Sequence, residues 1–308
     1  MPARPVPLRL VTHRPGGSLL PDGSVTVLLD RLVFPECPRW HDGRLWFSDM
    51  HDRKVWAMSQ QGQSELICEV PGQPAGLGWL PDGTLQVVSM TDRLLLRLER
   101  GKLEEIADLS QFFKYNANDM TTDAMGRAYI GNFGFDLDGG GEPTSTSMVC
   151  VDPDGDAWVV IEGLLFPNGA VITPDNVLIV AESFGQRLSA YDINEDGSLA
   201  NPRVWSDLRP NVPDGMCLDA EGGIWVADPV KKGVMRVLEG GVITNWVSTG
   251  ERGAYACALG GADGHTLYIC TAESSNPART VPLRTGRIEA VRVDIAASPE
   301  LGAGAASS

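Results

Sequence analysis

The sequence predicts an all-β protein, a six-bladed β-propeller formed as a single domain over residues 1–308. Three observations support this prediction: a unit that recurs six times, short apolar segments in every copy, and no central segment typical of a long amphipathic helix. A chain of this length is compatible with a one-domain propeller. A two-sheet β-sandwich with accidental self-similarity is the rival interpretation.

The six copies begin near residues 34, 73, 116, 166, 212 and 254. The first copy reads FPECPRWHDGRLWFSD, and the fourth reads FPNGAVITPDNVLIVAES. Their starts are 39 to 50 residues apart, and a period of about 40–50 residues with Gly-rich turns is typical of propeller blades. Because one copy cannot cover its own apolar faces, the copies must stack, and six of them can close into a ring.

Each copy contains a short apolar run that we expect to be a buried strand: LWFSD, LQVVSM, AYIGNF, LIVAES, IWVAD and LYICTA. Pairs such as Asp-Gly and Asp-Asn come before these runs and are typical of tight hairpin turns. Residues 24–33, SVTVLLDRLV, resemble the segments that end other copies. We therefore expect them to form the outer strand of the last blade and to close the ring. We expect the tail, residues 297–308, to be disordered.

The composition is acidic, with 25 Lys and Arg residues against 40 Asp and Glu residues and a formal net charge of -15. A nucleic-acid-binding protein needs a basic surface to neutralise phosphates, so we expect no nucleic-acid partner. No apolar run approaches the ~18 residues of a membrane span, and the N-terminus lacks the pattern of a signal peptide. We therefore expect no membrane partner, reduced cysteines and a cytoplasmic location. No pattern indicates an oligomeric state.

One position of the repeat carries an oxygen-bearing side chain in four of the six copies. We call these four residues the polar column: Glu36, Asn118, Asn168 and Asp214. The other two copies have Ala75 and Ala256 there. Since the first strand of a blade lies nearest the axis, we expect the polar column to face one mouth of the central channel. Alternatively, Asn or Asp in Pro-Asn-Gly and Pro-Asp-Gly can bond to the backbone of a local turn.

A bound cation would explain why these polar side chains converge. Buried polar groups are costly when unpaired, and two neighbouring carboxylates repel each other. Two carboxylates and two carboxamides, with no His or Cys, form a ligand set of hard oxygen atoms. We therefore expect one divalent cation on the axis, Ca²⁺ first, with Mg²⁺, Mn²⁺ or Zn²⁺ as alternatives.

The motifs PECPRW, NAND, FPNGAVITPD and VPDGMCLDAEGGIWVA resemble those of the senescence-marker-protein/gluconolactonase family, which includes regucalcin and bacterial sugar lactonases. The resemblance covers roughly residues 24–295 and implies a six-bladed propeller with one axial divalent metal and lactone-hydrolysing activity. It implies that Glu36, Asn168 and Asp214 are metal ligands. It also implies that Asn118, followed by Asp119, lies near the metal or the substrate. The family's substrate-binding Arg is replaced by Asn116, a departure that favours a less hydroxylated or more apolar lactone.

These observations predict a hydrolase that opens a lactone with metal-activated water. Asp214 is the candidate general base, and the alternative is that Asp214 is a ligand only. We expect Phe133, Phe135 and Tyr255 to line the substrate pocket, with Asn116, Asn118 and Asp119 near the substrate. The 133–147 loop is either a substrate-selecting lid or a disordered insert. Further residues are expected at the rim of the pocket: His51, Thr91, Asn132, Glu182, Asp228 and Glu273.

Two other functions stay open at this point. The same metal site would also suit hydrolysis of phosphotriesters or of other esters. A non-catalytic propeller would use the ion only to hold a scaffold together. Scaffold propellers do not need converging oxygen ligands, so the polar column favours an enzyme acting on a small lactone or ester.

Overall fold

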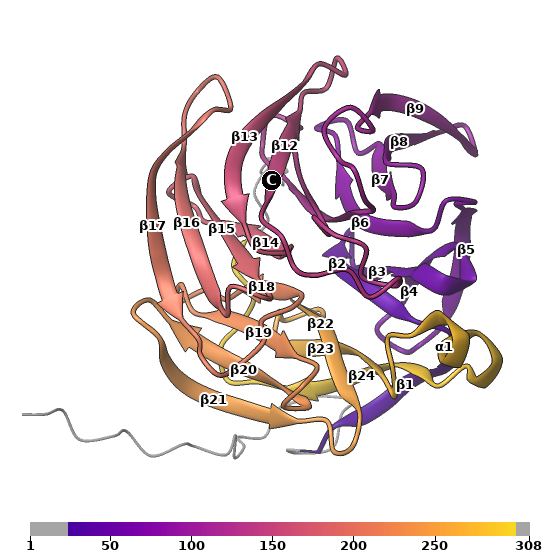
Figure 1. The fold of residues 1–308 in the computed structure, drawn as a ribbon. Helices are drawn as coiled ribbons and strands as arrows, with labels where there is room; N and C mark the ends of the chain where they lie inside the picture. The colour runs from indigo at the N-terminus through magenta and orange to yellow at the C-terminus, as the bar shows by residue number, and fades with distance from the viewer. Residues whose placement is uncertain (1–23, 300–308) are drawn as a thin grey trace, which may run out of the picture.

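The computed structural model describes residues 24–299. These residues form six four-stranded antiparallel sheets arranged around a central axis, as Figure 1 shows from the side that carries helix α1 (Pro277–Leu283). The six-bladed propeller is confirmed, and the β-sandwich interpretation is wrong. The described residues contain two helical elements, α1 and the 3₁₀ turn η1 (Met50–Asp52). No helix within residues 24–299 is long and apolar enough to cross a membrane.

Equivalent strands of the six sheets form four concentric layers. The innermost strands are β2 (Pro35–His41), β6 (Pro74–Trp79), β10 (Ala117–Thr122), β14 (Pro167–Ile172), β18 (Met216–Leu218) and β22 (Gly253–Gly260). The second strands are β3 (Arg44–Asp49), β7 (Leu85–Ser89), β11 (Ala128–Asn132), β15 (Val177–Glu182), β19 (Ile224–Asp228) and β23 (Thr266–Ala272).

The third strands are β4 (Lys54–Met58), β8 (Leu94–Glu99), β12 (Thr146–Val151), β16 (Arg187–Ile193), β20 (Gly233–Leu238) and β24 (Gly286–Arg292). The outer strands are β5 (Ser64–Glu69), β9 (Lys102–Asp108), β13 (Ala157–Leu164), β17 (Leu199–Asp207), β21 (Val242–Ser248) and β1 (Thr26–Leu32). All starts of the inner strands therefore lie at one end of the channel, and all their ends lie at the other.

Strand β1 closes the ring, and it lies within residues 24–33, the segment that was expected to form the closing strand. It pairs antiparallel with β24, with Thr26 opposite Ala290 and Val27 opposite Glu289. The last sheet thus combines one strand from the start of the described chain with three from its end. Since β1 covers the edge of β24, this pairing removes the free seam that an open ring would leave.

The end of the described chain corrects the expected start of the tail. Ala297 forms an antiparallel bridge with Asp219 and donates its N–H to the Gly264 carbonyl (2.9 Å). Ser298 donates its N–H to the Leu218 carbonyl (3.1 Å). The ordered chain therefore extends past residue 297, whereas residues 300–308 of the expected tail lie outside the described residues.

The hydrophobic core lies between neighbouring sheets. One buried cluster joins Tyr129 and Met148 of the third sheet to Leu178 and Val180 of the fourth. Every residue of the second strands β7, β19 and β23 is buried, as expected for apolar runs enclosed on both faces. Each sheet therefore needs its neighbours to bury its apolar residues, which favours the closed ring over isolated blades.

Candidate metal centre and active site

A β-bulge recurs at the polar-column position of the inner strands. Bulges increase local twist and re-aim a side chain, and they are frequent beside active sites. The pairing register shifts within five of the six inner strands, over Glu36/Arg39, Pro74/Leu77, Ala117/Met120, Pro167/Ala170 and Ala254/Ala256. In the remaining blade, the fifth, Asp214 comes just before β18, and its N–H donates to the Ala227 carbonyl (2.9 Å).

Glycines after Asn168 and Asp214 allow neighbouring inner strands to approach closely. A Cβ atom at Gly169 would lie 2.8 Å from the Asp214 carbonyl oxygen, and one at Gly215 would lie 2.4 Å from Ala256 Cβ. Neither glycine is among the residues with positive φ. These glycines are therefore required by contact between blades. The side chain of Asn168 bonds to Ser183, 15 positions along the chain, and not to the backbone of a local turn.

The two carboxylates of the polar column are buried and close enough to perturb each other. Glu36 is 7% exposed and Asp214 is 8% exposed. Burial raises the pKa of Glu36 to about 8, and the charge of Asp119 adds to this rise. The hydrogen bond from the Cys37 N–H to Glu36 Oε2 (3.1 Å) acts in the opposite direction and lowers this pKa. Burial, followed by the charge of Glu36, raises the pKa of Asp214 well above its usual value. Asp214 Oδ1 is buried and has no hydrogen-bond partner among the described residues.

The two carboxamides of the polar column are oriented through their NH₂ groups. Asn118 Nδ2 donates to the Pro167 carbonyl (3.1 Å), and Asn168 Nδ2 donates to Ser183 Oγ (3.2 Å). Ser183 Oγ in turn donates to the Pro213 carbonyl (2.7 Å), which links the fourth blade to the segment before Asp214. With the NH₂ groups engaged, the Oδ1 atoms are the ligand atoms that these residues can offer to a cation.

The donor set fits a divalent cation. The part of the chain between residues 24 and 299 contains no group of three or more His, Cys, Asp and Glu side chains suited to a metal. The polar column instead combines two carboxylates with two carboxamides, which are typical ligands of hard cations such as Ca²⁺. An unpaired buried Asp214 Oδ1 is costly, and a cation would compensate it.

Below the polar column, Asp119 forms an ion pair with Arg39, a residue that the sequence analysis did not single out. Asp119 Oδ1 accepts from Arg39 Nη2 (2.7 Å) and from the Met120 N–H (2.8 Å). Asp119 was expected near the substrate, and its side chain is buried, like Glu36 and Asp214 of the polar column. A charged arginine in an innermost strand needs an oppositely charged partner. The position of Arg39 in the first strand of its copy was therefore the signal from which such a pair could have been predicted. Asn116, also expected near the substrate, is half-buried, and its carbonyl accepts the Phe133 N–H (2.9 Å).

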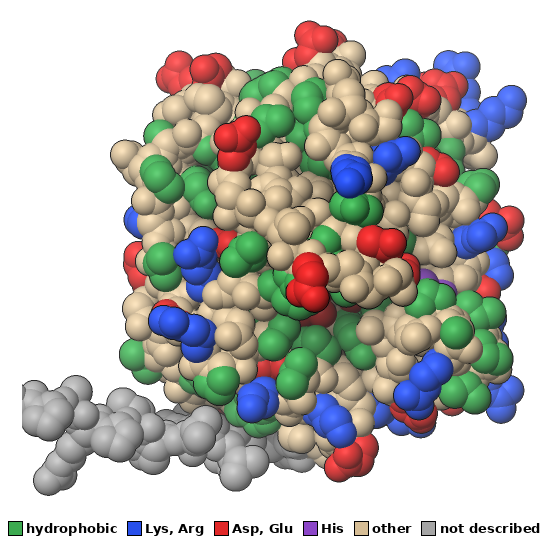
Figure 2. All heavy atoms as spheres, viewed as in Figure 1, with side chains coloured by type: hydrophobic (Ala, Val, Ile, Leu, Met, Phe, Trp, Pro, Cys, Tyr) green, Lys and Arg blue, Asp and Glu red, His purple; other side chains and the backbone are tan. Residues whose placement is uncertain are grey.

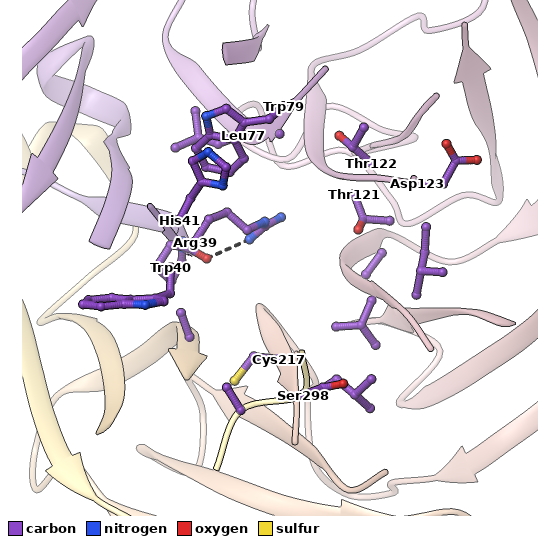
Figure 3. Close-up of a pocket in the computed structure, with 18 of the residues that line it drawn as sticks. Arg39, Trp40, His41, Leu77, Trp79, Thr121, Thr122, Asp123, Cys217 and Ser298 are labelled. Carbon is purple, nitrogen blue, oxygen red and sulfur yellow. Dashed lines mark hydrogen bonds between the residues drawn. The ribbon is translucent and has the colours of Figure 1, made fainter. Parts of the chain in front are cut away.

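A cavity of about 750 Å³ lies at the other end of the channel, where the inner strands end. Figure 3 shows Arg39 pointing into this cavity, with Trp40, His41 and Trp79 on one side and Thr121, Thr122 and Asp123 on the other. No residue of the polar column lines it. The cavity and the polar column thus lie at different ends of the channel.

Three residues expected at the rim of the pocket are buried and support the backbone before the polar column. Glu182 Oε2 accepts the Leu165 N–H (3.0 Å), and Asp228 Oδ2 accepts the Val212 N–H (3.1 Å). Asn132 Oδ1 accepts the Gly134 N–H (2.9 Å) and thereby holds the start of the 133–147 loop. These buried side chains position the backbone near the site and are not rim residues. Of the other expected rim residues, Thr91 and Glu273 are exposed and His51 is half-buried.

The 133–147 loop contributes to a cluster of four phenylalanines, Phe133, Phe135, Phe166 and Phe184, which we call the phenylalanine cluster. Their ring centroids are 4.9 to 5.8 Å apart. The loop is held by its own hydrogen bonds, including Gly141 N–H to the Asp136 carbonyl (2.7 Å). Figure 2 shows hydrophobic and acidic side chains together around the centre of this face.

A second aromatic group contains Tyr255. Its ring packs edge-on against Phe34 (4.8 Å between centroids), and Phe34 stacks on His51 (4.7 Å). Burial, followed by the charge of Asp214, raises the pKa of Tyr255 to about 12. Burial lowers the pKa of His51 to about 4. Near neutral pH, Tyr255 is therefore a protonated hydroxyl close to Asp214, and His51 is uncharged.

A family model described as SMP-30/Gluconolactonase/LRE-like region matches residues 34–273. The chain belongs to this family. The resemblance drawn from the sequence motifs is thereby confirmed, and it covers all four residues of the polar column.

Named relatives within the SMP-30/gluconolactonase family have low sequence identity to this chain. Pentonolactonase XacC of Haloferax volcanii is 26% identical over 254 residues, 77% of this chain and 81% of that protein. The 6-deoxy-6-sulfogluconolactonase of Pseudomonas putida is 23% identical over 274 residues, 85% of this chain and 92% of that protein. Regucalcin of Danio rerio is 25% identical over 261 residues, 80% of this chain and 85% of that protein.

Solved structures with the same fold include a luciferin-regenerating enzyme, with a TM-score of 0.76 at 19% identity over 90% of this chain and 98% of that one. The calcium-binding protein regucalcin of Agrobacterium tumefaciens gives a TM-score of 0.75 at 19% identity, over 89% of this chain and 95% of that one. These likenesses support the propeller architecture.

Proposed function

We propose that this protein is a lactonase that hydrolyses its substrate at the polar column with the help of one divalent cation, Ca²⁺ being the first candidate. The observation that carries the proposal is the pair of buried carboxylates, Glu36 and Asp214. Both have raised pKa values, and Oδ1 of Asp214 has no hydrogen-bond partner among the described residues. Further support comes from relatives named pentonolactonase and 6-deoxy-6-sulfogluconolactonase.

The cation would be held by oxygen atoms of the polar column. When bound, a divalent cation polarises an ester carbonyl and lowers the pKa of a water molecule. Asn118 and Asn168 would each contribute Oδ1, because their NH₂ groups are already bonded to Pro167 and Ser183. The cation would also offset the repulsion between the two buried carboxylates, so that both are ionised in the working enzyme.

We propose that Asp214 accepts the proton of the attacking water. Its unpartnered Oδ1 supports this role, because an available carboxylate oxygen can accept that proton as the carbonyl carbon is attacked. Tyr255 is buried beside Asp214 and stays protonated, so its hydroxyl can donate a hydrogen bond to a substrate oxygen. The bond between the carbonyl carbon and the ring oxygen then breaks, and the ring oxygen takes the proton from Asp214 and leaves as the hydroxyl of the opened hydroxy acid.

Hydrolysis of a panel of lactones, followed by base consumption at constant pH with and without a chelator, tests the proposal. We expect turnover that chelation abolishes and that Ca²⁺, Mg²⁺, Mn²⁺ or Zn²⁺ restores to different extents. Turnover that survives complete chelation would contradict the role of the cation. Turnover of phosphotriesters in place of lactones would favour the alternative that the protein is a phosphotriester hydrolase. Cation binding without turnover of any ester would favour the scaffold.

The role of Asp214 is tested separately with Asp214→Asn at saturating cation, its occupancy measured by calorimetry. A large loss of kcat in the loaded variant supports proton transfer to Asp214. Normal kcat with weakened cation binding would leave Asp214 as a ligand alone.

A further inference from the structure

The phenylalanine cluster lies directly beside the polar column. Phe166 is two residues before Asn168, and its carbonyl accepts the Ser183 N–H (3.1 Å). Ser183 Oγ is the partner of Asn168 Nδ2 (3.2 Å), and Phe184 follows Ser183 in the chain. The backbone that carries two of the four rings is therefore the backbone that orients one of the proposed cation ligands.

The other two rings come from the connection between β11 and β12. Phe133 stacks on Phe166 (4.9 Å between centroids, 28° between planes), and its N–H donates to the Asn116 carbonyl (2.9 Å), two residues before Asn118. Phe135 packs against Phe184 at 5.3 Å and 85°. Three connections that are distant in the sequence thus bring their aromatic rings together next to Asn118 and Asn168.

The cluster keeps one ring available to a ligand. Phe135 and Phe166 are 5% and 8% exposed, whereas Phe184 is 46% exposed although two rings of the cluster pack against it. Phe184 thus adds exposed apolar surface to the edge of a buried apolar cluster, and an apolar ligand group that packs on it is taken out of water. The rings themselves offer a hydroxyl group no conventional hydrogen-bond partner.

We propose that the site takes lactones that carry an extended apolar substituent, an alkyl chain or an aryl group, and that Phe184 is a specificity-determining residue for that substituent. The inference rests on the proposed function: the ester group is held at the polar column while the substituent lies along the phenylalanine cluster. A polyhydroxylated lactone of similar ring size would place hydroxyl groups against these rings and lose their hydrogen bonds with water.

The test compares kcat/KM for γ-decanolactone, γ-butyrolactone and glucono-1,5-lactone. The first two share one ring and differ by a hexyl chain. We expect the wild-type protein to prefer γ-decanolactone to γ-butyrolactone by at least about tenfold, the scale on which apolar pockets discriminate. We expect Phe184→Ser to reduce that preference about tenfold, mainly through KM. Met125→Ser is the matched control, since Met125 is 65% exposed in the turn between β10 and β11 at the other end of the channel.

Two results would overturn the inference while leaving lactone hydrolysis in place. One is a preference for glucono-1,5-lactone over γ-decanolactone, and the other is an unchanged preference in Phe184→Ser. If no lactone is hydrolysed, the proposed function fails and the inference is decided by binding alone. In that case, calorimetry with 5-hexylpyrrolidin-2-one and pyrrolidin-2-one should show tighter binding of the hexyl compound, reduced about tenfold by Phe184→Ser. Equal binding of the two lactams would refute it.

Discussion

The two ends of the axial channel are built by the same six strands, but their chemistry differs. Where the inner strands start, four oxygen-bearing side chains come together, three of them at bulges, and Oδ1 of the buried Asp214 has no partner among the described residues. Where the same strands end, aromatic rings, threonines, Arg39 and Asp123 surround a cavity of about 750 Å³. The first end brings two carboxylates and two carboxamides together, and the second has the cavity. The comparison teaches that the groups suited to hold a cation and the space suited to hold a ligand lie apart in this channel.

The largest expected effect is at the polar column. Asp214→Asn keeps the shape of the side chain but removes its charge, so we expect weaker cation binding and a loss of kcat/KM of about 10²–10³-fold. Asp42→Asn is the matched control, because Asp42 lines the cavity at the other end and should leave both quantities unchanged. Cation titration by calorimetry and lactone hydrolysis measure the two effects. Equal losses in both variants would mean that the two ends do not differ as described.

Removing the ion pair between Arg39, which lines the cavity, and Asp119, which follows Asn118 of the polar column, should lower stability. Arg39→Met leaves the Asp119 carboxylate buried without its partner, so we expect the free energy of unfolding to fall by about 3 kcal/mol. The double variant Arg39→Met/Asp119→Asn removes both charges and should recover part of that loss. Urea unfolding of the cation-free proteins gives both values. A double variant that is less stable than Arg39→Met would show that the ion pair is not the cause.

The pH dependence of cation binding sharpens the comparison. Burial raises the pKa of Glu36 from 4.5 to about 8 in the cation-free protein, so below that pH a cation must displace a proton. We expect the apparent affinity to rise with pH, by up to about tenfold per unit for each proton that the cation displaces from Glu36 or Asp214. Calorimetry in two buffers with different ionisation enthalpies measures the protons released. An affinity that does not change between pH 6 and 9 would contradict the burial of a protonated Glu36.

The same pKa shift predicts how the cation-free protein responds to pH. Glu36 ionises at a lower pH in the unfolded chain than in the folded one. Its contribution to stability is therefore fully present below about pH 4.5 and is lost as the pH rises through about 8. Thermal unfolding with chelator should show this loss, and saturating cation should suppress it. A cation-free protein that gains stability from pH 5 to 8 would argue against the shift.

The smallest effect is expected at the wide end of the channel. Thr121→Val replaces a hydroxyl in the cavity wall with a methyl group of similar volume and lies away from the polar column. We expect kcat/KM for lactones to stay within about twofold, the range of substitutions remote from the reacting groups. A tenfold loss in this variant would show that the cavity takes part in the reaction.

Several features could be predicted from the sequence because they repeat. The six copies, their apolar strands and the closing strand β1 follow from local patterns, and alignment of the copies selected the polar column. Other features could not be predicted, because they join segments that no repeat relates. Arg39 and Asp119 are 80 positions apart, and whether Arg39 faces the axis depends on the bulge after Glu36. The phenylalanine cluster joins three separate connections, one of which had two open interpretations.

The sequence by itself determined the number of blades, their order and the residue types at each equivalent position, because hydrophobic periodicity and turn chemistry act over a few residues. Only the tertiary structure decided which side chains meet: it brought Glu36 near Asp214, paired Arg39 with Asp119, and set Phe184 against rings from another blade. The physical reason is that burial and charge act through space. The pKa of Glu36 and the missing partner of Asp214 Oδ1 exist only once the ring has closed.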